Sequence, residues 1–475
     1  MPKQPKHWQN FIAGQWCDAE RSIEVFNPAT GEVFASVACA SLEDVNKAMS
    51  AARECVNSGE LTRCRPTERA ALLRRIANEI RALQQQGAEL LVLENGKSLA
   101  DANEEFAVAA GYFDYYAGMA DKIEGKSIPL GENYVDFTYY EPMGVSVQIV
   151  PWNFPVDVCA RSLAPALAAG CAVVVKSPEN TPLAMTLLAQ ACERAGLPTG
   201  ALSLLCGYGN ETGAALVVHP EVDQIVFTGS VATGRYILRE AAQQATPCVM
   251  ELGGKSAAVV FADADIDELI ESVRWGIFFN AGQVCSAMSR MLVQREIYEA
   301  VVARVTEFAE SMAFDDSFTA VISAEQKARV LAMCDRAQED GARLMTGGKS
   351  QDRQGYFVAP TVFSDVSSSS ELFREEVFGP VLAMTPFDTE EEAWALANAT
   401  DYGLVAGVFT RDLGRAMRAS RALRAGQVFV NEWYAGGIET PFGGVGLSGF
   451  GREKGQEALY SYVRTKNVAI RVSNN

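Results

Sequence analysis

The chain has 475 residues, 48% of them hydrophobic and 21% charged, a composition that excludes a disordered or fibrous protein. Its length predicts two or three domains. The formal net charge of −18 excludes a nucleic-acid partner, because 59 acidic side chains would repel a phosphate backbone. With no apolar run long enough to cross a bilayer and no secretory signal at the start, we expect a cytosolic protein without a membrane partner.

Helices are predicted over residues 41–118, where apolar residues recur at spacings of three and four, with Ser41 and Thr67 placed as N-caps. The next segment, 121–142, is rich in β-branched and aromatic residues and has turn breaks at Gly131 and Pro142. It predicts an antiparallel hairpin. The final GQEALYSYVRTKNVAIRV predicts a short helix and a strand that could pair with this hairpin or with a neighbouring chain.

Between these regions, short apolar runs alternate with helical stretches. One series contains VSVQIVPW, CAVVVKSP, LSLLCG and QIVFTGS, and a second contains SAAVVFAD, MLVQ, GLVAGVFT and GQVFVN. Buried strands that alternate with helices are typical of parallel sheets. The sequence therefore predicts an α/β fold with two α/β domains side by side.

Cysteine and histidine usage narrows the possible chemistry. The eleven cysteines are scattered without a CxxC pair, and most, such as Cys171 and Cys206, lie in apolar segments, so buried free thiols are expected. Only two histidines are present, His7 and His219, so neither a metal site nor a Ser-His-Asp triad is expected. A nucleophilic enzyme with this sequence must use a base other than histidine.

Two segments have the features of phosphate or ribose sites. In VVVKSPE a predicted buried strand ends at Lys176, and Glu179 follows three residues later. Open α/β sheets bind ligands at the carboxyl ends of their strands. The alternative is that Lys176 is a solvated lysine at a strand end. QIVFTGSVATG turns from a strand into a helix through Gly229 and Ser230, with Gly234 in the helix, which suits a pyrophosphate. Its spacing matches neither the dinucleotide fingerprint nor a Walker loop.

Three further residues could carry chemistry. Cys285 lies in FFNAGQVCSA, a run of small residues that suits an accessible thiol, although a core cysteine is the alternative. Glu251, in MELGGKS, could activate water if an apolar site raises its pKa. Asn153 lies in the turn IVPWNFP, a type of turn that is more often structural.

Together with FNPATGEVFASV, EEVFGP and PFGGVGLSGFGRE, these segments make essentially the whole chain resemble the aldehyde dehydrogenase superfamily. The resemblance implies a Rossmann-type cofactor domain, an α/β catalytic domain and a small β bridging or oligomerisation element. The corresponding ranges are 1–120 and 143–254, then 255–446, then 121–142 and 447–475. Free strand edges in the bridging element imply a homodimer or homotetramer.

The same resemblance implies a role for individual residues. Cys285 matches the catalytic thiol, Glu251 the general base, and Asn153 the amide that forms an oxyanion hole with the Cys285 backbone N–H. The implied cofactor is NAD and the implied substrate an aldehyde. Glu179 should bind the ribose 2′-hydroxyl and repel a 2′-phosphate, so NAD is preferred over NADP. The cofactor-binding positions are Val150, Trp152, Lys176, Glu179, Gly209, Gly229, Ser230, Gly234, Glu376 and Phe378.

The chain departs from the family pattern in the predicted substrate tunnel, lined by Phe154, Asp157, Arg161, Glu439 and Phe442. Asp157, Ala160 and Arg161 stand where the family has bulky apolar residues and a Trp-Lys pair, which predicts a wider, more polar tunnel. We hypothesise that Asp157 and Glu439 favour a polar, amino- or semialdehyde. The alternative is that Asp157 pairs with Arg161.

Three other functions are compatible with parts of this pattern. A CoA-acylating dehydrogenase would share the thiol, but such enzymes tend to lack a carboxylate at the position of Glu251. A thiol esterase that acts through Cys285 would need no nucleotide. A non-catalytic family member would have no reason to retain Cys285, Glu251 and Asn153 together.

Overall fold

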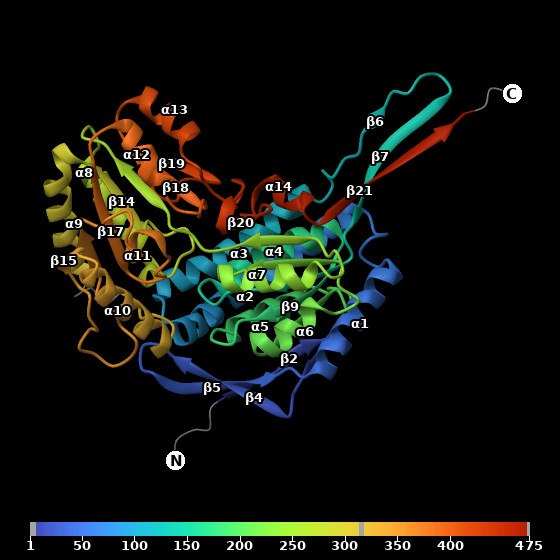
Figure 1. Ribbon diagram of the computed structural model, residues 1–475. Coiled ribbons are helices and arrows are strands. Elements are labelled where there is room, and N and C mark those ends of the chain that lie inside the picture. Colours follow the sequence, from blue (N-terminus) through green and yellow to red (C-terminus); the bar gives the residue numbers. More distant parts are fainter. Residues whose placement is uncertain (1–5, 313–317, 473–475) are drawn as a thin grey trace, which may run out of the picture.

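Two large sheets form the framework of the protein in a computed structural model that describes residues 6–312 and 318–472 (Figure 1). The eight-stranded sheet has the order β20 (Gly449–Phe450), β12 (Cys248–Glu251), β11 (Gln224–Thr228), β8 (Val145–Ile149), β9 (Ala172–Ser177), β10 (Leu202–Cys206), β2 (Asn10–Ile12) and β3 (Gln15–Cys17). The strands from β12 to β10 run parallel, and the outer strands are antiparallel.

The seven-stranded sheet has the order β15 (Arg343–Thr346), β16 (Thr361–Ser364), β17 (Val381–Phe387), β14 (Arg290–Gln294), β13 (Ala257–Val260), β18 (Val405–Phe409) and β19 (Gln427–Val430). All of its pairs are parallel except β15 with β16. The eight runs named in the two sequence series all form strands, and every residue of β9, β10, β11, β13 and β18 is buried. The predicted α/β class is confirmed.

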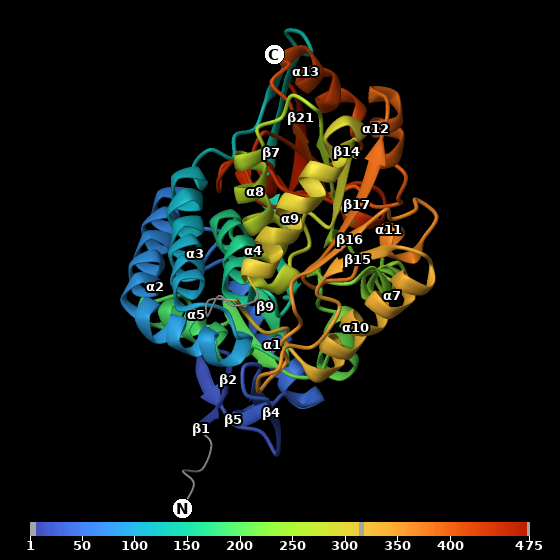
Figure 2. The same ribbon diagram turned by 90° about the vertical axis from the view of Figure 1, so that its left-hand side faces the viewer.

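Helices pack around both sheets (Figure 2). The buried side chains form two large hydrophobic cores and one small one. Phe154 packs against both large cores, so the segment just before α4 lies where they meet. The helices are α1 (Leu42–Ser58), α2 (Pro66–Asn95), α3 (Leu99–Met119), α4 (Pro155–Ala169), α5 (Leu183–Arg194), α6 (Ala214–Val217), α7 (Val231–Ala241), α8 (Ile266–Val273), α9 (Tyr298–Met312), α10 (Ala324–Glu339), α11 (Glu371–Arg374), α12 (Glu390–Ala397), α13 (Leu413–Ala422) and α14 (Gly455–Tyr460).

One of the two predicted helix caps is correct. Ser41 accepts a hydrogen bond from the Asp44 N–H and begins α1. The expectation for Thr67 is wrong: α2 already begins at Pro66, a residue favoured in the first helical position because its fixed φ suits a helix and it has no N–H to satisfy.

A small sheet projects from the body of the molecule (Figure 1). The predicted hairpin forms β6 (Ser127–Ile128) and β7 (Tyr134–Pro142), and β21 (Val463–Arg471) pairs antiparallel with β7, as the final strand was expected to do. A second small sheet of β1 (Lys6–Trp8), β5 (Glu32–Cys39) and β4 (Arg21–Asn27) was not predicted. Although residues 447–475 were expected in the bridging element, β20 pairs with β12 in the eight-stranded sheet. No helix in the described ranges is long and apolar enough to cross a membrane.

Candidate active site

Asn153 is fixed between the end of β8 and the start of α4. Its side-chain Nδ2 donates to the backbone carbonyl of Gln283 at 2.9 Å. Its own backbone carbonyl accepts from Lys97 Nζ at 3.1 Å and from Asn280 Nδ2 at 3.2 Å. An amide nitrogen carries two N–H bonds, so one N–H remains for an acceptor in the adjoining cavity.

Cys285 follows a tightly wound loop. Asn280, Ala281 and Gly282 all have left-handed backbone conformations, with φ of 49°, 52° and 70°, a form of strain that clusters at functional sites. A side chain at Gly282 would overlap the carbonyl oxygen of Gly379, and one at Gly254 would place its Cβ 2.5 Å from the Cys285 carbonyl oxygen. The loop is therefore held by close backbone packing on two sides.

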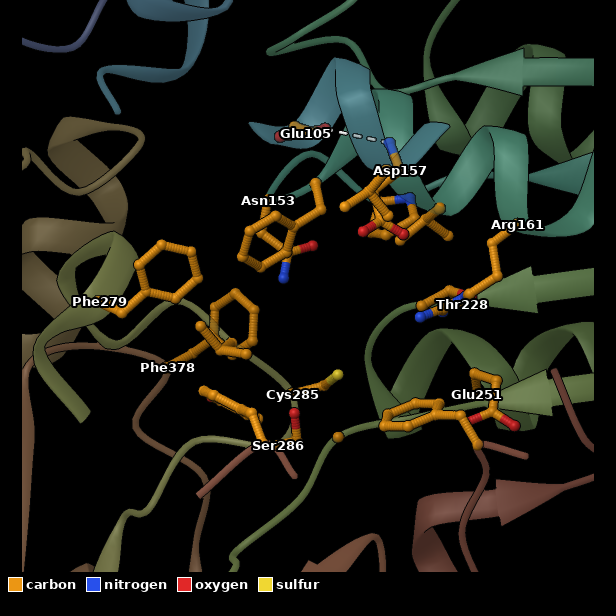
Figure 3. Close-up of a pocket in the computed structure, with 18 of the residues that line it drawn as sticks. Glu105, Asn153, Asp157, Arg161, Thr228, Glu251, Phe279, Cys285, Ser286 and Phe378 are labelled. Atoms are coloured by element: carbon orange, nitrogen blue, oxygen red, sulfur yellow. Dashed lines mark hydrogen bonds between the residues drawn. The ribbon is translucent and has the colours of Figure 1, made fainter. Parts of the chain in front are cut away.

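The Cys285 thiol lines a cavity and is only partly exposed. Burial raises the pKa of Cys285 to about 12, and the nearby positive charge of Arg161 acts in the opposite direction. In Figure 3 the sulfur and the Asn153 amide both point into the cavity. A thiol in this setting becomes a strong nucleophile only when its proton is removed or its thiolate is stabilised.

Glu251, the last residue of β12, is buried and neither carboxylate oxygen has a hydrogen-bond partner. Burial raises the pKa of Glu251 well above its usual value, the charge of Glu453 raises it further, and Arg161 opposes both effects. An unpartnered carboxyl with a raised pKa can accept a proton from water near neutral pH.

A buried ion pair joins α4 to the segment before α14. Arg161 Nη2 lies 2.5 Å from Glu453 Oε2, in a geometry that lacks the angles of a hydrogen bond, and the guanidinium lies 5.1 Å from the centre of the Phe442 ring. The alternative pairing of Asp157 with Arg161 is therefore wrong. Asp157 Oδ1 is buried without a hydrogen-bond partner.

The strand ends form a separate polar group. Lys176 Nζ contacts Glu179 Oε2 at 2.6 Å, and the Lys176 carbonyl accepts from the Val150 N–H at 3.2 Å. A Cβ built on Gly209 would lie 3.9 Å from Glu179 Oε1. The ion pair with Lys176 lowers the pKa of Glu179 in spite of burial, so this carboxylate is ionised at neutral pH.

The glycine turn leads directly into α7. Ser230 caps the helix by accepting from the Thr233 N–H at 3.2 Å. Gly234 permits close packing, since a Cβ there would lie 2.6 Å from Leu252. The Gly229 N–H donates to the Glu251 carbonyl at 3.0 Å, and the first N–H groups of α7 form a helix N-terminus of the kind that binds phosphates.

Glu376 and Phe378 approach the chain that follows Glu251. Glu376 Oε1 accepts from the Gly254 N–H at 3.0 Å, and burial raises the pKa of Glu376 to about 7. Phe378 has a left-handed φ of 55°, and its ring packs edge-on against Trp152 with centroids 5.3 Å apart.

One cavity of about 680 Å³ brings most of the predicted residues together (Figure 3). Its walls include Trp152, Asn153, Phe154, Asp157, Arg161, Gly229, Ser230, Glu251, Cys285, Glu376, Phe378 and Phe442. The other predicted residues, which do not line it, are Val150, Lys176, Glu179, Gly209, Gly234 and Glu439. Glu439 is exposed and is not among the residues that line the cavity, so its place in the substrate tunnel stays a prediction.

Sequence reasoning missed several wall residues. Asp101, Glu104, Glu105 and Tyr112 come from α3, and Trp275, Phe279, Tyr434 and Lys454 from later segments. On α3 the spacings of three, one and seven between these residues place them on one helical face. The helical spacing in the sequence could have shown that these α3 residues share a face, but it does not show which part of the protein that face contacts.

Comparison with known proteins agrees with this geometry. Residues 16–468 match the model of the aldehyde dehydrogenase family. The chain is 40% identical to an aldehyde dehydrogenase of Alternaria alternata (96% of this chain, 93% of the relative) and 39% identical to the peroxisomal aminoaldehyde dehydrogenase 1 of Pisum sativum (97% and 95%). The structure of the NAD⁺ complex of Bacillus cereus aldehyde dehydrogenase superposes with a TM-score of 0.96 at 38% identity, covering 98% of this chain and 97% of that one.

A family match across nearly the entire length, together with a cavity lined by a thiol, an amide and a carboxyl, leads to one conclusion. The chain belongs to the aldehyde dehydrogenase family and is an oxidoreductase.

Proposed function

We propose that this enzyme oxidises an aldehyde to a carboxylic acid with NAD, through a thioester on Cys285. The observation that carries the proposal is that Cys285, Asn153 and Glu251 line one cavity. The Cys285 thiol releases its proton to solvent as its sulfur adds to the aldehyde carbon, and the resulting oxyanion accepts hydrogen bonds from Asn153 Nδ2 and the Cys285 backbone N–H. After oxidation to the thioester, Glu251 takes a proton from water as it attacks, and the acid leaves as the thiol is restored.

The residues present fit NAD. Gly229 and Ser230, at the N-terminus of α7, line the cavity and suit a pyrophosphate, while Lys176 and Glu179 suit ribose hydroxyls. Glu376 would hold the second ribose. NAD supplies the hydride acceptor when bound. The ionised Glu179 carboxylate supports a preference for NAD over NADP, because it would repel a 2′-phosphate.

NADH formation from a panel of aldehydes tests the proposal, with Cys285→Ser as the inactive control. If coenzyme A were the acyl acceptor, its addition would yield an acyl-CoA instead of the acid. Ester hydrolysis without any NADH production, and without quenching of protein fluorescence by NAD, would favour the thiol esterase instead.

A cationic aldehyde is the substrate class that we propose. The Asp157 carboxylate has an unpartnered oxygen, and Asp101 and Glu104 also line the cavity. Three cations line this cavity. Arg161 is engaged by Glu453 and Arg329 donates to the Glu376 backbone carbonyl, which leaves Lys454 opposed by three carboxylates. The similarity to a pea aminoaldehyde dehydrogenase supports the same class.

The discriminating measurement is kcat/KM for an aminoaldehyde relative to hexanal. Wild-type enzyme should prefer the aminoaldehyde. Asp157→Leu should reduce that preference about tenfold, because one charge-assisted contact contributes roughly 1.4 kcal/mol and this free energy corresponds to a factor of about ten. Glu439→Gln is the matched control, because Glu439 is exposed outside the cavity wall. Equal activity of wild type and Asp157→Leu on both substrates would refute the assignment.

We also propose a homodimer or homotetramer. The small projecting sheet ends in β6 and β21, and the seven-stranded sheet ends in β15 and β19, so these strand edges lack a partner within the described residues. Unpaired edges favour pairing with another chain. Light scattering coupled to size exclusion would return the mass of a single chain if this proposal were wrong.

A cytosolic location is proposed on the basis of the thiols. All eleven cysteines are free thiols, and seven of them are buried. The seven include Cys171 and Cys206, which were predicted to be buried free thiols. Free thiols persist in reducing compartments. Imaging of a fluorescent fusion in the source cell would test the location.

A further inference from the structure

A buried ion pair between Lys97 and Glu105 lies next to Asn153. Lys97 is 2% exposed and Glu105 is 4% exposed. Lys97 Nζ contacts Glu105 Oε2 and donates to the Asn153 backbone carbonyl at 3.1 Å. The other carboxylate oxygen, Glu105 Oε1, accepts from the N–H groups of Val156 at 2.9 Å and Asp157 at 3.2 Å; Figure 3 shows the second of these bonds.

These contacts converge on the short segment that carries the reacting amide. Phe154, the N-cap of α4, provides no side-chain hydrogen bond, so the first N–H groups of the helix need another acceptor. Glu105 provides it from α3. Lys97 Nζ also lies 4.3 Å from the centre of the Phe154 ring. The ion pair therefore holds the backbone at the Asn153 carbonyl and at the first turn of α4.

We propose that Lys97 and Glu105 are positioning residues that aim the Asn153 amide at the oxyanion, an inference that rests on the proposed function. The backbone carbonyl of Asn153 accepts hydrogen bonds from Lys97 Nζ at 3.1 Å and from Asn280 Nδ2 at 3.2 Å. Loss of Lys97 would remove the shortest of the three bonds to this carbonyl, leaving Asn280 and a longer contact from Asn95 at 3.5 Å, and would let the amide tilt. A donor acts on an oxyanion only when it is correctly placed before the reaction.

Three variants test this role: Lys97→Met, Glu105→Gln and the double variant Lys97→Met/Glu105→Leu. Loss of one partner strands a buried charge, whereas loss of both removes that penalty, so the double variant is expected to fold even if a single one does not. In every variant that folds, kcat for aldehyde oxidation should fall roughly 10- to 100-fold, the effect of displacing a catalytic group by about 1 Å. The KM for NAD should change less than about twofold.

A second readout separates positioning from a general structural defect. Acylation of Cys285 by p-nitrophenyl acetate forms an oxyanion before p-nitrophenolate leaves, whereas alkylation by iodoacetamide displaces iodide without one. The proposal expects acylation to slow by the same factor as oxidation, with alkylation nearly unchanged. Glu94→Gln is the matched control: Glu94 is a buried carboxyl that accepts from the Leu183 and Ala184 N–H groups of α5 and does not contact Asn153.

Each outcome decides the matter. Selective loss of acylation in the Lys97 and Glu105 variants, with Glu94→Gln active, supports the proposal. Parallel loss of acylation and alkylation, unchanged acylation, or an equal acylation defect in Glu94→Gln would overturn it. If wild-type enzyme formed no NADH from any aldehyde, the proposed function would fail, while the acylation comparison would still report on the positioning of Asn153.

Discussion

Replacing Arg161 with methionine breaks a buried ion pair and should lower the stability of the protein. Arg161 is 8% exposed, Glu453 is 1% exposed and their charged atoms lie 2.5 Å apart. Removing one partner of such a pair costs about 3–5 kcal/mol, because the other charge stays buried and unpaired. With an unfolding entropy of about 2.1 cal/mol/K per residue, a 475-residue chain should lose roughly 3–5 °C in Tm.

The loss of stability should depend on pH. Without Arg161, the pKa of Glu453 in the folded variant rises above its unfolded value of about 4.3, because burial already raises it and its neutralising partner is gone. A carboxyl with a raised folded pKa destabilises the fold as pH increases above the unfolded pKa. The difference in Tm between wild type and Arg161→Met should therefore be small at pH 4 and largest above neutral pH.

The same substitution should reduce the reactivity of Cys285. The Arg161 charge lowers the pKa of the Cys285 thiol, so its loss shifts the pH profile of iodoacetamide alkylation to higher pH. Arg161→Met/Glu453→Leu should recover most of the Tm and keep the shifted profile, and Arg161→Lys should preserve the wild-type profile. Scanning fluorimetry and alkylation rates from pH 6 to 10 provide both measurements. An unshifted profile in both methionine variants would refute the electrostatic reasoning.

Three further outcomes follow from the proposed roles. Glu251→Gln should retain a rapid burst of NADH but turn over slowly, since thioester hydrolysis loses its base; stopped-flow absorbance would show no burst if Glu251 acted before oxidation. Asn153→Ala should lower kcat by about 10²–10³, the usual effect of removing one oxyanion donor, and a loss confined to KM would contradict that role. Glu179→Gln should narrow the ratio of kcat/KM for NAD over NADP, and a wild-type preference for NADP would disprove the assignment of Glu179.

The framework of the fold could be predicted because its strands leave a local signature. Each strand of the two sequence series is a short apolar run, most of these strands are buried on both faces, and the alternation with helices specifies parallel sheets. Residues 6–39 gave no such signal. Their strands are short or only partly buried, and β1 pairs with β5 across a gap in the chain, a contact that local pattern does not encode.

Some residues of the candidate site could likewise be predicted from the sequence, and others could not. Cys285, Glu251 and Asn153 lie in recognisable segments, so they could be named before the cavity was known. The ion-pair partner of Arg161 could not be named from the sequence, because Glu453 lies far along the chain. Asp157 is one helical turn from Arg161, so local spacing favoured that pairing instead. Asp101 and Glu104 were read only as part of a helix, since helical spacing reveals a shared face without revealing its neighbour.

Backbone packing around the Cys285 loop limits how this enzyme can change. Gly254 and Gly282 have no room for a Cβ, although neither is expected to touch substrate. A library that randomises the cavity walls together with these two glycines should therefore yield altered substrate ranges through the side chains of α3 and α4, while both glycines return unchanged among active clones. The backbone of the Cys285 loop should therefore stay the same in variants whose substrate specificity differs.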